Sequence, residues 1–353
     1  MYREGAPITP AGAISLQRSE RVLSAPIVET VNPIKALGLD QVESDMARFE
    51  PLLAESVIIG DDFLDQITTH LIHAGGKRLR PLLSLASATG GQRAATDEEL
   101  LGGVAVELMH LASLYHDDVM DEATMRRTVE SVNARYGNIV AIVAGDFLMA
   151  RSAAIAADLG TEISSLLANT LAELTRGQVS EVRTAFQTDR TIADYDEAIY
   201  GKTASLMAAA SRIGGLTSGA PASELKALTT YGAELGMIFQ LRDDILDITA
   251  TEGQLGKPAG QDLAEGIYTL PVIYALSDSD VADELRALLG HPLDEPEREK
   301  ARSLVEGTSG IEQSVTRAKE HVALANNVAA TLTSEPLRAA YSTLATSLLD
   351  DIL

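Results

Sequence analysis

The chain has 353 residues, 46% of them hydrophobic, and a formal net charge of −23. This length is sufficient for two average domains or for one large domain with a sizeable core. The negative charge excludes nucleic acid and anionic membranes as partners that long-range electrostatics would attract. The chain contains no cysteine, which excludes disulfides, thiolate nucleophiles and cysteine-bound zinc and suits a cytoplasmic location.

Residues 1–36 are predicted to form a flexible N-terminal extension. This segment holds four prolines, lacks clear periodicity and contains no continuous apolar run of the kind found in a signal peptide. In the whole chain no stretch approaches 18 uninterrupted apolar residues, so the sequence predicts no membrane-spanning helix and a soluble protein.

Residues 37–353 are predicted to form one large all-α domain. Apolar residues recur at helical spacing, as in Val42, Met46, Phe49 and Leu52, whereas strand-like alternation is scarce. Glycine and proline breaks separate roughly ten to twelve helices, and no break is long enough for a domain linker. The helices from about Glu297 onward are expected to pack as a C-terminal subdomain.

The first chemically informative segment is the basic run of residues 75–81. It places Lys77, Arg78 and Arg80 close together, behind two glycines and ahead of a proline. Glycines allow an anion to approach the backbone closely, and lysine and arginine donate hydrogen bonds to phosphate oxygens. The segment is therefore a candidate phosphate-binding loop, although a charged helix start would show the same residues.

The strongest signal is an acidic motif that occurs twice, each time at the end of an apolar, helix-compatible run. On a helix, the first and fifth residues of the motif lie on one face, roughly 6 Å apart along the axis. Such carboxylates need a counter-charge, and a hard divalent cation such as Mg²⁺ is the natural one. A single copy is typical of a solvated acidic face, but two copies indicate a metal site for an anionic ligand such as a diphosphate. The six candidate metal ligands are Asp117, Asp118 and Asp121 in the first cluster and Asp243, Asp244 and Asp247 in the second.

Several basic residues near these clusters are candidates for binding the same ligand. Arg126 and Arg127 follow the first cluster, Lys202 follows a glycine, and Lys257 lies in a Gly/Pro loop after the second cluster. Each has a simpler explanation when taken alone, since the two arginines could neutralise acidic residues on the preceding turn. His110 lies two helical turns before the first cluster on the same face, where a core histidine is the usual interpretation.

Taken in order, these motifs resemble those of the trans-polyprenyl diphosphate synthases. The resemblance covers about residues 60–280 directly and is greatest for the long-chain members, the hepta- to decaprenyl diphosphate synthases. One departure is that Thr128, Val129 and Glu130 follow the two arginines, where the family commonly has Gly-x-Pro. The matching segments are the two acidic clusters, residues 75–81, Arg126-Arg127, Lys202-Thr203, residues 256–263 and Thr269-Leu270-Pro271.

The resemblance implies an all-α isoprenoid synthase fold, a large single-domain helical bundle around a central cavity that usually forms a homodimer. It implies repeated condensation of isopentenyl diphosphate with an allylic diphosphate, with about three Mg²⁺ ions per site held by the six aspartates. The product would be a long-chain all-trans polyprenyl diphosphate, whose usual use is the side chain of a quinone such as menaquinone. Peripheral contact with a membrane, at most, would release it.

The resemblance also implies roles for individual residues. Lys77, Arg80, His110 and Arg127 match positions that hold isopentenyl diphosphate in the family. Arg126, Lys202 and Lys257 match positions on the allylic diphosphate. Thr203 and Gln240 match positions whose oxygens face the carbocation that forms when the allylic C–O bond breaks.

Product length is predicted from the helix face that runs back from Asp117. Ser113 lies four residues earlier and Met109 eight residues earlier, with Ala112 beside Ser113. At about 1.5 Å per residue, Ser113 lies one turn from the metal ligands, near the first added isoprene unit. A bulky side chain there would block elongation, so Ala112 and Ser113 predict a product of roughly six to ten isoprene units. The same small residues would also permit close helix packing.

Four alternatives remain open. A geranylgeranyl or farnesyl diphosphate synthase would be recognised by its shorter product. A terpene cyclase would need no second diphosphate pocket, which leaves Lys77, Arg80 and Arg127 unexplained. A non-catalytic partner subunit of a hetero-oligomeric synthase would be inactive alone, and an acidic metal-binding helical protein would not need the basic loops.

Overall fold

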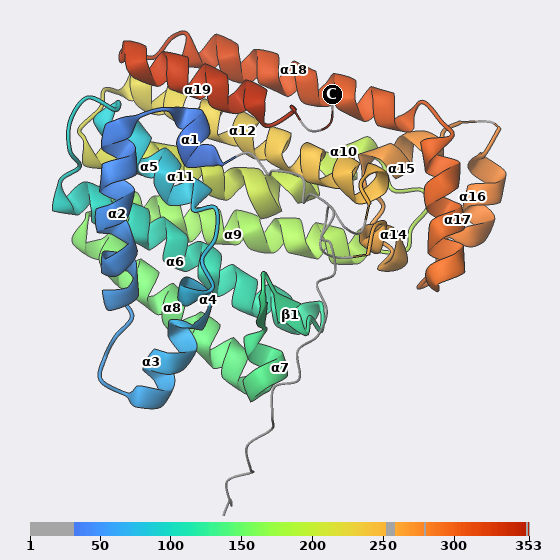
Figure 1. The fold of residues 1–353 in the computed structure, drawn as a ribbon, viewed down its shortest axis with the longest axis horizontal. Helices are drawn as coiled ribbons and strands as arrows, with labels where there is room; N and C mark the ends of the chain where they lie inside the picture. The colour runs from blue at the N-terminus through green and yellow to red at the C-terminus, as the bar shows by residue number, and fades with distance from the viewer. Residues whose placement is uncertain (1–31, 252–257, 279, 351, 353) are drawn as a thin grey trace, which may run out of the picture.

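The computed structural model describes residues 32–251, 258–278, 280–350 and 352. Regular structure in these residues is almost entirely helical, which confirms the predicted fold class (Figure 1). Figure 1 shows long helices lying side by side across the molecule, with the last two helices along one edge. The long helices account for the expected number, and several short helical segments add to it.

The described N-terminal residues form four helices: α1 (Pro33–Leu37), α2 (Asp40–Glu55), α3 (Asp62–Thr68) and α4 (His70–His73). The α1 helix lies partly within the segment predicted to be a flexible extension. The side chain of Asn32 caps it by accepting from the amides of Ile34 and Lys35, and Pro33 suits its first turn. The extension therefore cannot reach residue 36, while residues 1–31 lie outside the described part of the chain.

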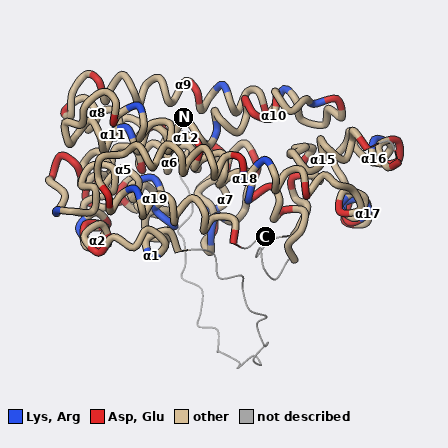
Figure 2. The backbone as a smooth tube through the Cα atoms, turned by 90° about the horizontal axis from the view of Figure 1, so that it is seen from above, with Lys and Arg blue, Asp and Glu red and all other residues tan. Residues whose placement is uncertain are grey.

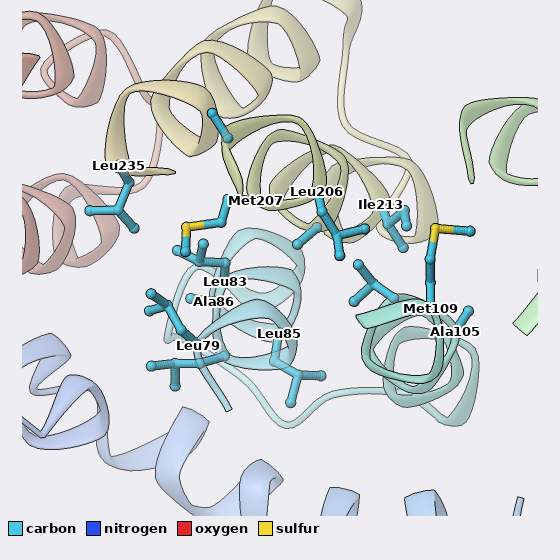
Figure 3. Packing of buried hydrophobic residues seen from close by; sticks show 14 of the residues in the cluster. Leu79, Leu83, Leu85, Ala86, Ala105, Met109, Leu206, Met207, Ile213 and Leu235 are labelled. Atoms are coloured by element: carbon cyan, nitrogen blue, oxygen red, sulfur yellow. The ribbon is translucent and has the colours of Figure 1, made fainter. Parts of the chain in front are cut away.

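The centre of the molecule is a bundle of six helices. They are α5 (Leu79–Thr89), α6 (Asp97–Met120), α8 (Asn138–Asp158), α9 (Thr161–Thr184), α11 (Ser205–Thr217) and α12 (Ala222–Thr249). Buried side chains of α5, α6, α11 and α12 meet in the close-up of Figure 3. Gly214 of α11 allows close approach to α5, because a Cβ atom there would lie 2.0 Å from the carbonyl oxygen of Ser84.

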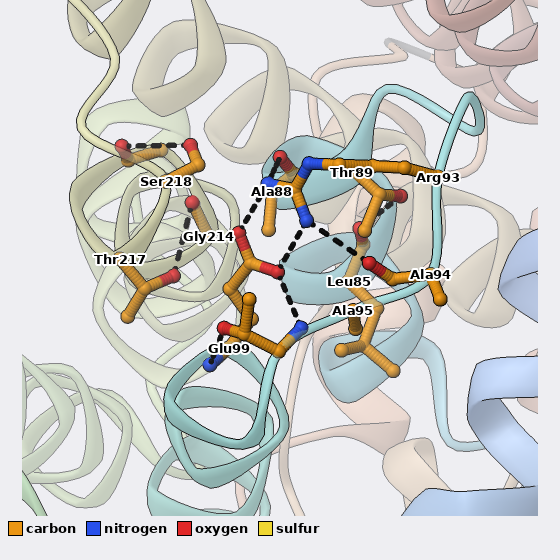
Figure 4. Close-up of polar contacts among 12 residues, drawn as sticks. Leu85, Ala88, Thr89, Arg93, Ala94, Ala95, Glu99, Gly214, Thr217 and Ser218 are labelled. Atoms are coloured by element: carbon orange, nitrogen blue, oxygen red, sulfur yellow. Dashed lines mark hydrogen bonds and ion pairs between the residues drawn. The ribbon is translucent and has the colours of Figure 1, made fainter.

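The start of α6 is fixed by a capping box. The Thr96 hydroxyl accepts from the Glu99 amide at 3.3 Å, and the Thr96 amide donates to the Glu99 carboxylate at 2.8 Å. Arg93 completes this cap with an ion pair to Glu99 at 2.5 Å and a hydrogen bond to the Ala88 carbonyl (Figure 4). These contacts tie the N-terminal end of α6 to the end of α5, and the first acidic cluster lies at the opposite end of α6.

A short hairpin follows α6, although the sequence showed no hairpin signal. Strands β1 (Met125–Arg126) and β2 (Val129–Glu130) pair antiparallel, and α7 (Val132–Tyr136) follows. Arg127 occupies the turn with φ of 59°, a left-handed conformation that two-residue hairpin turns require at their first position. The hairpin turns the chain back after the first acidic cluster and directs Arg126 toward it.

The C-terminal region divides differently from the prediction. A second apolar cluster includes Ile248, Leu263, Tyr268, Leu285 and Ala301. It joins the end of α12 to α14 (Gln261–Ala264), α15 (Leu270–Ala275), α16 (Ala282–Leu288) and α17 (Glu295–Glu306). In contrast, α18 (Gly310–Ala329) and α19 (Glu335–Ser347) pack on the main core, so the helices after Glu297 do not form one separate subdomain.

The α8 helix is the one described helix that is long and apolar enough to cross a membrane, with a mean hydropathy of 1.8. It was not predicted from sequence because its apolar run is interrupted by Asp146 and Arg151. In the folded chain, 39% of its most apolar window is buried, and α8 packs against α6. Its length and composition therefore also fit a helix that covers a protein core.

Candidate active site

A cleft of about 710 Å³ opens between α6, the β-hairpin, α9, α10 (Ile192–Ile199), α12 and the segment before α15. It brings together residues that lie far apart in the sequence. Those predicted from sequence are Asp121, Arg126, Lys202, Thr203, Gln240 and Asp244, and further polar residues of the lining include Glu181, Arg190 and Tyr195.

The first acidic cluster occupies the last turn of α6. Asp118 is 1% exposed, and its Oδ1 accepts from the Arg126 Nε at 2.6 Å, whereas its Oδ2 is buried without a hydrogen-bond partner. Burial raises the pKa of Asp117 to about 6, and burial also raises the pKa values of Asp118 and Asp121. These carboxylates therefore lie in surroundings that lack part of the positive charge they need.

The second acidic cluster lies on α12, and its best-defined member is Asp244. This carboxylate is 2% exposed and accepts from the Tyr195 hydroxyl at 2.6 Å and from the Gln240 side-chain amide at 2.9 Å. Burial raises its pKa to about 7 even though both hydrogen bonds favour the charged form. The Thr203 hydroxyl donates to Gln240 at 2.8 Å, so these four residues form one hydrogen-bonded chain along the cleft wall.

The other two aspartates of the second cluster have different surroundings. Asp243 is half-exposed and forms an ion pair with Arg242 at 2.8 Å. Asp247 is buried, and its carboxylate accepts a hydrogen bond from the Asp262 amide at 3.2 Å. Its backbone carbonyl accepts a hydrogen bond from the Gly260 amide. Asp247 therefore fixes the turn that precedes α14.

Glu181 of α9 lies near both acidic clusters and was not among the predicted site residues. Its carboxylate pairs with the Lys202 Nζ at 2.5 Å, and its charge contributes to the raised pKa values of Asp117, Asp121 and Asp244. Burial opposes the charge of Lys202, but Glu181 and the first cluster more than compensate and raise its pKa. A single glutamate in a long amphipathic helix carries no distinguishing sequence signal, and the same is true of Tyr195.

A π-helix, η1 (Tyr200–Ala204), presents Lys202 and Thr203 to the cleft. Such helices are rare and occur mostly at functional sites. Its backbone is held between two glycines: a Cβ on Gly177 of α9 would lie 2.6 Å from the Lys202 amide nitrogen, and one on Gly236 of α12 would lie 2.5 Å from the Ala204 Cα. Backbone contact on both sides fixes the position of Lys202 and Thr203.

A second basic group of residues lies beside the cleft. Burial lowers the pKa of Arg80 to about 10 and lowers the pKa of His110 well below its usual value, which makes this imidazole neutral near pH 7. Arg127 donates to the Leu71 carbonyl at 3.0 Å and packs on Gly76, and the Lys77 ammonium lies 5.7 Å from the centre of the Phe239 ring.

Arg78 has a structural rather than a ligand-binding environment. Its guanidinium pairs with Glu107 at 2.9 Å and with Glu50 at 2.9 Å, and it donates to the Ile72 carbonyl. Burial raises the pKa of Glu107, although Arg78, Arg80 and Arg127 all favour its charged form. Glu107 is therefore a buried carboxyl group surrounded by several arginines.

Two groups of predicted residues stay untested. Lys257 lies outside the described residues. Met109 and Ala112 are buried in the main core, and the Ser113 hydroxyl donates to the His110 carbonyl at 2.8 Å; none of the three lines the cleft. Figure 3 shows Met109 among the packed side chains of α6 and α11.

The donor set suits a hard divalent cation, although no cage is formed in advance. Within the described ranges, no three carboxylate or imidazole side chains are grouped closely enough to hold a metal ion. Asp118 and Asp244 are instead held by Arg126, Tyr195 and Gln240. The unpartnered Asp118 Oδ2 and the raised pKa of Asp244 nevertheless fit residues that would bind Mg²⁺.

Acidic residues are spread along the whole tube of Figure 2, with lysines and arginines between them. The net charge of −23 is thus a property of the molecule as a whole and not of one face. An anionic ligand would be attracted by local basic residues of the cleft and not by the overall field.

Comparison with known proteins gives one consistent result. A family model described as polyprenyl synthetase matches residues 61–306. A nonaprenyl diphosphate synthase of Mycobacterium tuberculosis is 38% identical over 323 residues, which cover 91% of this chain and 96% of that protein. A heptaprenyl diphosphate synthase component 2 of Geobacillus stearothermophilus is 41% identical over 276 residues, covering 77% and 85% of the two chains.

The fold is also found among solved structures. A polyprenyl synthase from Caulobacter crescentus, crystallised with calcium and isoprenyl diphosphate, superposes with a TM-score of 0.83 at 31% identity. The match covers 90% of this chain and 97% of the other.

Proposed function

The chain belongs to the polyprenyl synthetase family, and from this premise we propose that it condenses isopentenyl diphosphate repeatedly with an allylic diphosphate. The product would be a long-chain all-trans polyprenyl diphosphate, because the similar proteins include nonaprenyl and heptaprenyl diphosphate synthases. The use of this product in a quinone side chain and a cytoplasmic location are further parts of the proposal.

One observation supports this proposal most strongly: one aspartate of each acidic cluster, Asp121 and Asp244, lines a single cleft together with Arg126, Lys202 and Thr203. The clusters come from α6 and α12, and both lie near Glu181, whose negative charge helps to raise the pKa values of Asp117 and Asp244. Carboxylates with raised pKa values beside cationic side chains form a site that would bind a metal–diphosphate complex.

Catalysis would depend on stabilising a departing diphosphate. Heterolysis of the allylic C–O bond leaves an allylic carbocation and a diphosphate anion; the double bond of isopentenyl diphosphate then attacks C1, and the departed diphosphate takes the proton that leaves the resulting cation. Mg²⁺, about three ions bound by the six aspartates, would supply positive charge that stabilises the leaving group. Arg126 and Lys202 would donate hydrogen bonds to its oxygens where negative charge develops.

Other residues of this chain would orient the substrates. The chain of Thr203, Gln240, Asp244 and Tyr195 would hold hydroxyl and amide oxygens toward the carbocation. Lys77, Arg80, His110 and Arg127 would bind isopentenyl diphosphate, and a neutral His110 would act as a hydrogen-bond donor there.

We also propose that two copies of this chain form a homodimer through α8. One face of this helix exposes Ile139, Ile142 and Val143 at 80%, 42% and 56%. His116, which precedes the first acidic cluster, contacts the Ile142 carbonyl at 3.2 Å, so the proposed interface adjoins the active site. Light scattering of purified Ile139→Glu should give the monomer mass, whereas Leu324→Glu, at an exposed position of α18, should leave the dimer unchanged.

The test of the proposed activity is incubation of the purified chain with MgCl₂, labelled isopentenyl diphosphate and an allylic primer. Chromatography of the dephosphorylated products should show chains of roughly six to ten isoprene units, the length that the small residues Ala112 and Ser113 predict. Products of three or four units would favour a farnesyl or geranylgeranyl diphosphate synthase.

A second candidate is a subunit that needs a partner chain, because one similar protein is named as component 2 of its synthase. Inactivity of the pure chain, restored by a second protein, would support that candidate.

A further inference from the structure

Among the described residues, three cationic side chains line the cleft: Arg126, Lys202 and Arg190. The first two match family positions for the allylic diphosphate, but nothing assigns a role to Arg190. It lies in the connection between α9 and α10 and lines the same cleft as Arg126.

The charges of Arg126 and Lys202 are already matched by carboxylates. Arg126 pairs with Asp118 at 2.5 Å, and Lys202 pairs with Glu181 at 2.5 Å. Among the described residues, Arg190 forms no ion pair with a carboxylate within 4.0 Å. Of the three cations, it is therefore the one whose charge lacks a close described counter-ion.

Arg190 is also held in a defined position. One guanidinium nitrogen, Nη1, donates to the Tyr268 carbonyl at 2.9 Å, and the group lies 5.8 Å from the centre of the Tyr195 ring. The residue is 6% exposed, and its Nε is buried without a hydrogen-bond partner in the described structure. A buried guanidinium remains charged, so a donor left without an acceptor costs stability unless a ligand supplies one.

Its neighbours place Arg190 close to Asp244 of the second acidic cluster. Tyr195, beneath its guanidinium, donates to Asp244 at 2.6 Å. The charges of Glu181 and Asp244 also act on Arg190. A diphosphate that bridged the two acidic clusters would therefore lie beside Arg190.

We propose that Arg190 is a further anion-binding residue of this site and donates hydrogen bonds to the diphosphate of the allylic substrate. The proposal rests on the proposed function. Because two contacts already fix the guanidinium, little side-chain freedom would be lost when the diphosphate binds.

The experiment compares wild type, Arg190→Gln and Arg190→Lys with Arg183→Gln as the matched control. Arg183 is an exposed arginine of α9 outside the cleft, so its substitution changes the net charge equally. In Arg190→Gln the KM for the allylic diphosphate should rise at least tenfold, which corresponds to about 1.4 kcal/mol. The KM for isopentenyl diphosphate should change less than twofold, and Arg190→Lys should recover part of the loss.

A binding measurement keeps this inference separate from the proposed function. Calorimetry with inorganic diphosphate in MgCl₂ should show at least tenfold weaker binding to Arg190→Gln than to wild type or Arg183→Gln. If wild type makes no prenyl product but shows this difference, the proposed function fails while Arg190 is still shown to bind a diphosphate at this cleft.

Equal changes in both KM values, or unchanged diphosphate affinity, would show that Arg190 only links Tyr195 to the Tyr268 backbone. If Arg190→Gln does not fold, as judged by its thermal melting, Arg190→Lys decides. A folded lysine variant whose diphosphate affinity and KM for the allylic diphosphate equal those of wild type would overturn the proposed hydrogen bonds from the guanidinium. Weaker diphosphate binding by this variant would support them.

Discussion

Replacing Asp244 with asparagine should stabilise the metal-free protein while reducing its turnover. Asp244 is 2% exposed, and burial raises its pKa from 3.8 to about 7. At about 1.36 kcal/mol per pKa unit, ionising this group in the folded state costs up to about 4 kcal/mol above pH 7. An asparagine carries no charge and retains both contacts, since its oxygen can accept from Gln240 and its nitrogen can donate to Tyr195.

The pH dependence follows from the direction of the shift. The folded state binds this proton more tightly than the unfolded state, so the contribution of Asp244 to stability falls as pH rises from about 4 to about 7. The free energy of unfolding of Asp244→Asn should therefore exceed that of wild type by roughly 2 kcal/mol at pH 5 and by up to about 4 kcal/mol at pH 8. Other titrating groups, including Asp117, are present in both proteins and largely cancel in the comparison.

Urea denaturation followed by circular dichroism, with EDTA present, measures this difference at both pH values. Asp283→Asn is the control, because Asp283 is fully exposed and its replacement should change the free energy of unfolding by no more than about 0.5 kcal/mol. With MgCl₂ and both substrates, Asp244→Asn should lose turnover by orders of magnitude. A variant that is less stable than wild type at pH 8, or whose gain does not grow between pH 5 and pH 8, would refute the reasoning.

Gly201→Ala should lower the melting temperature and reduce turnover, because a Cβ there would lie 2.7 Å from a backbone oxygen of α9. Melting is followed by circular dichroism, and Gly307→Ala is the control because the nearest atom to a Cβ there is 3.4 Å away. Arg78→Met should destabilise the fold by about 3–5 kcal/mol in urea denaturation, because it leaves the buried Glu107 without its closest counter-charge; a loss below 1 kcal/mol would contradict this. Ser113→Phe should shorten the main product seen by chromatography, and an unchanged length would show that the growing chain follows another path.

The helical architecture could be predicted because its cause is local. Apolar residues at helical spacing and glycine or proline breaks identify the long helices before any tertiary contact is known. The β1–β2 hairpin was missed because Arg127, and not glycine or asparagine, adopts the positive φ in its turn. The α1 helix was missed because the prolines around it were read as a sign of flexibility, although Pro33 suits a first turn.

The candidate site was only partly predictable, and there is a physical reason why some of its residues could be predicted and others could not. The two acidic clusters repeat in sequence, so Asp121 and Asp244 could be predicted to share a site before the cleft was seen. Glu181, Arg190 and Tyr195 come from separate elements and acquire a role only through tertiary proximity. The same limit applies to Arg78, whose place in a basic loop suggested phosphate binding but whose partners are Glu50 and Glu107.

The most direct test of the central claim is a crystal structure with MnCl₂ and an unreactive thio analogue of an allylic diphosphate, using anomalous scattering to locate the metal. The account predicts manganese peaks within about 2.5 Å of carboxylate oxygens from both Asp117 on α6 and Asp244 on α12, with the diphosphate between them. Manganese bound to one cluster alone, or a diphosphate located away from Lys202, would contradict it.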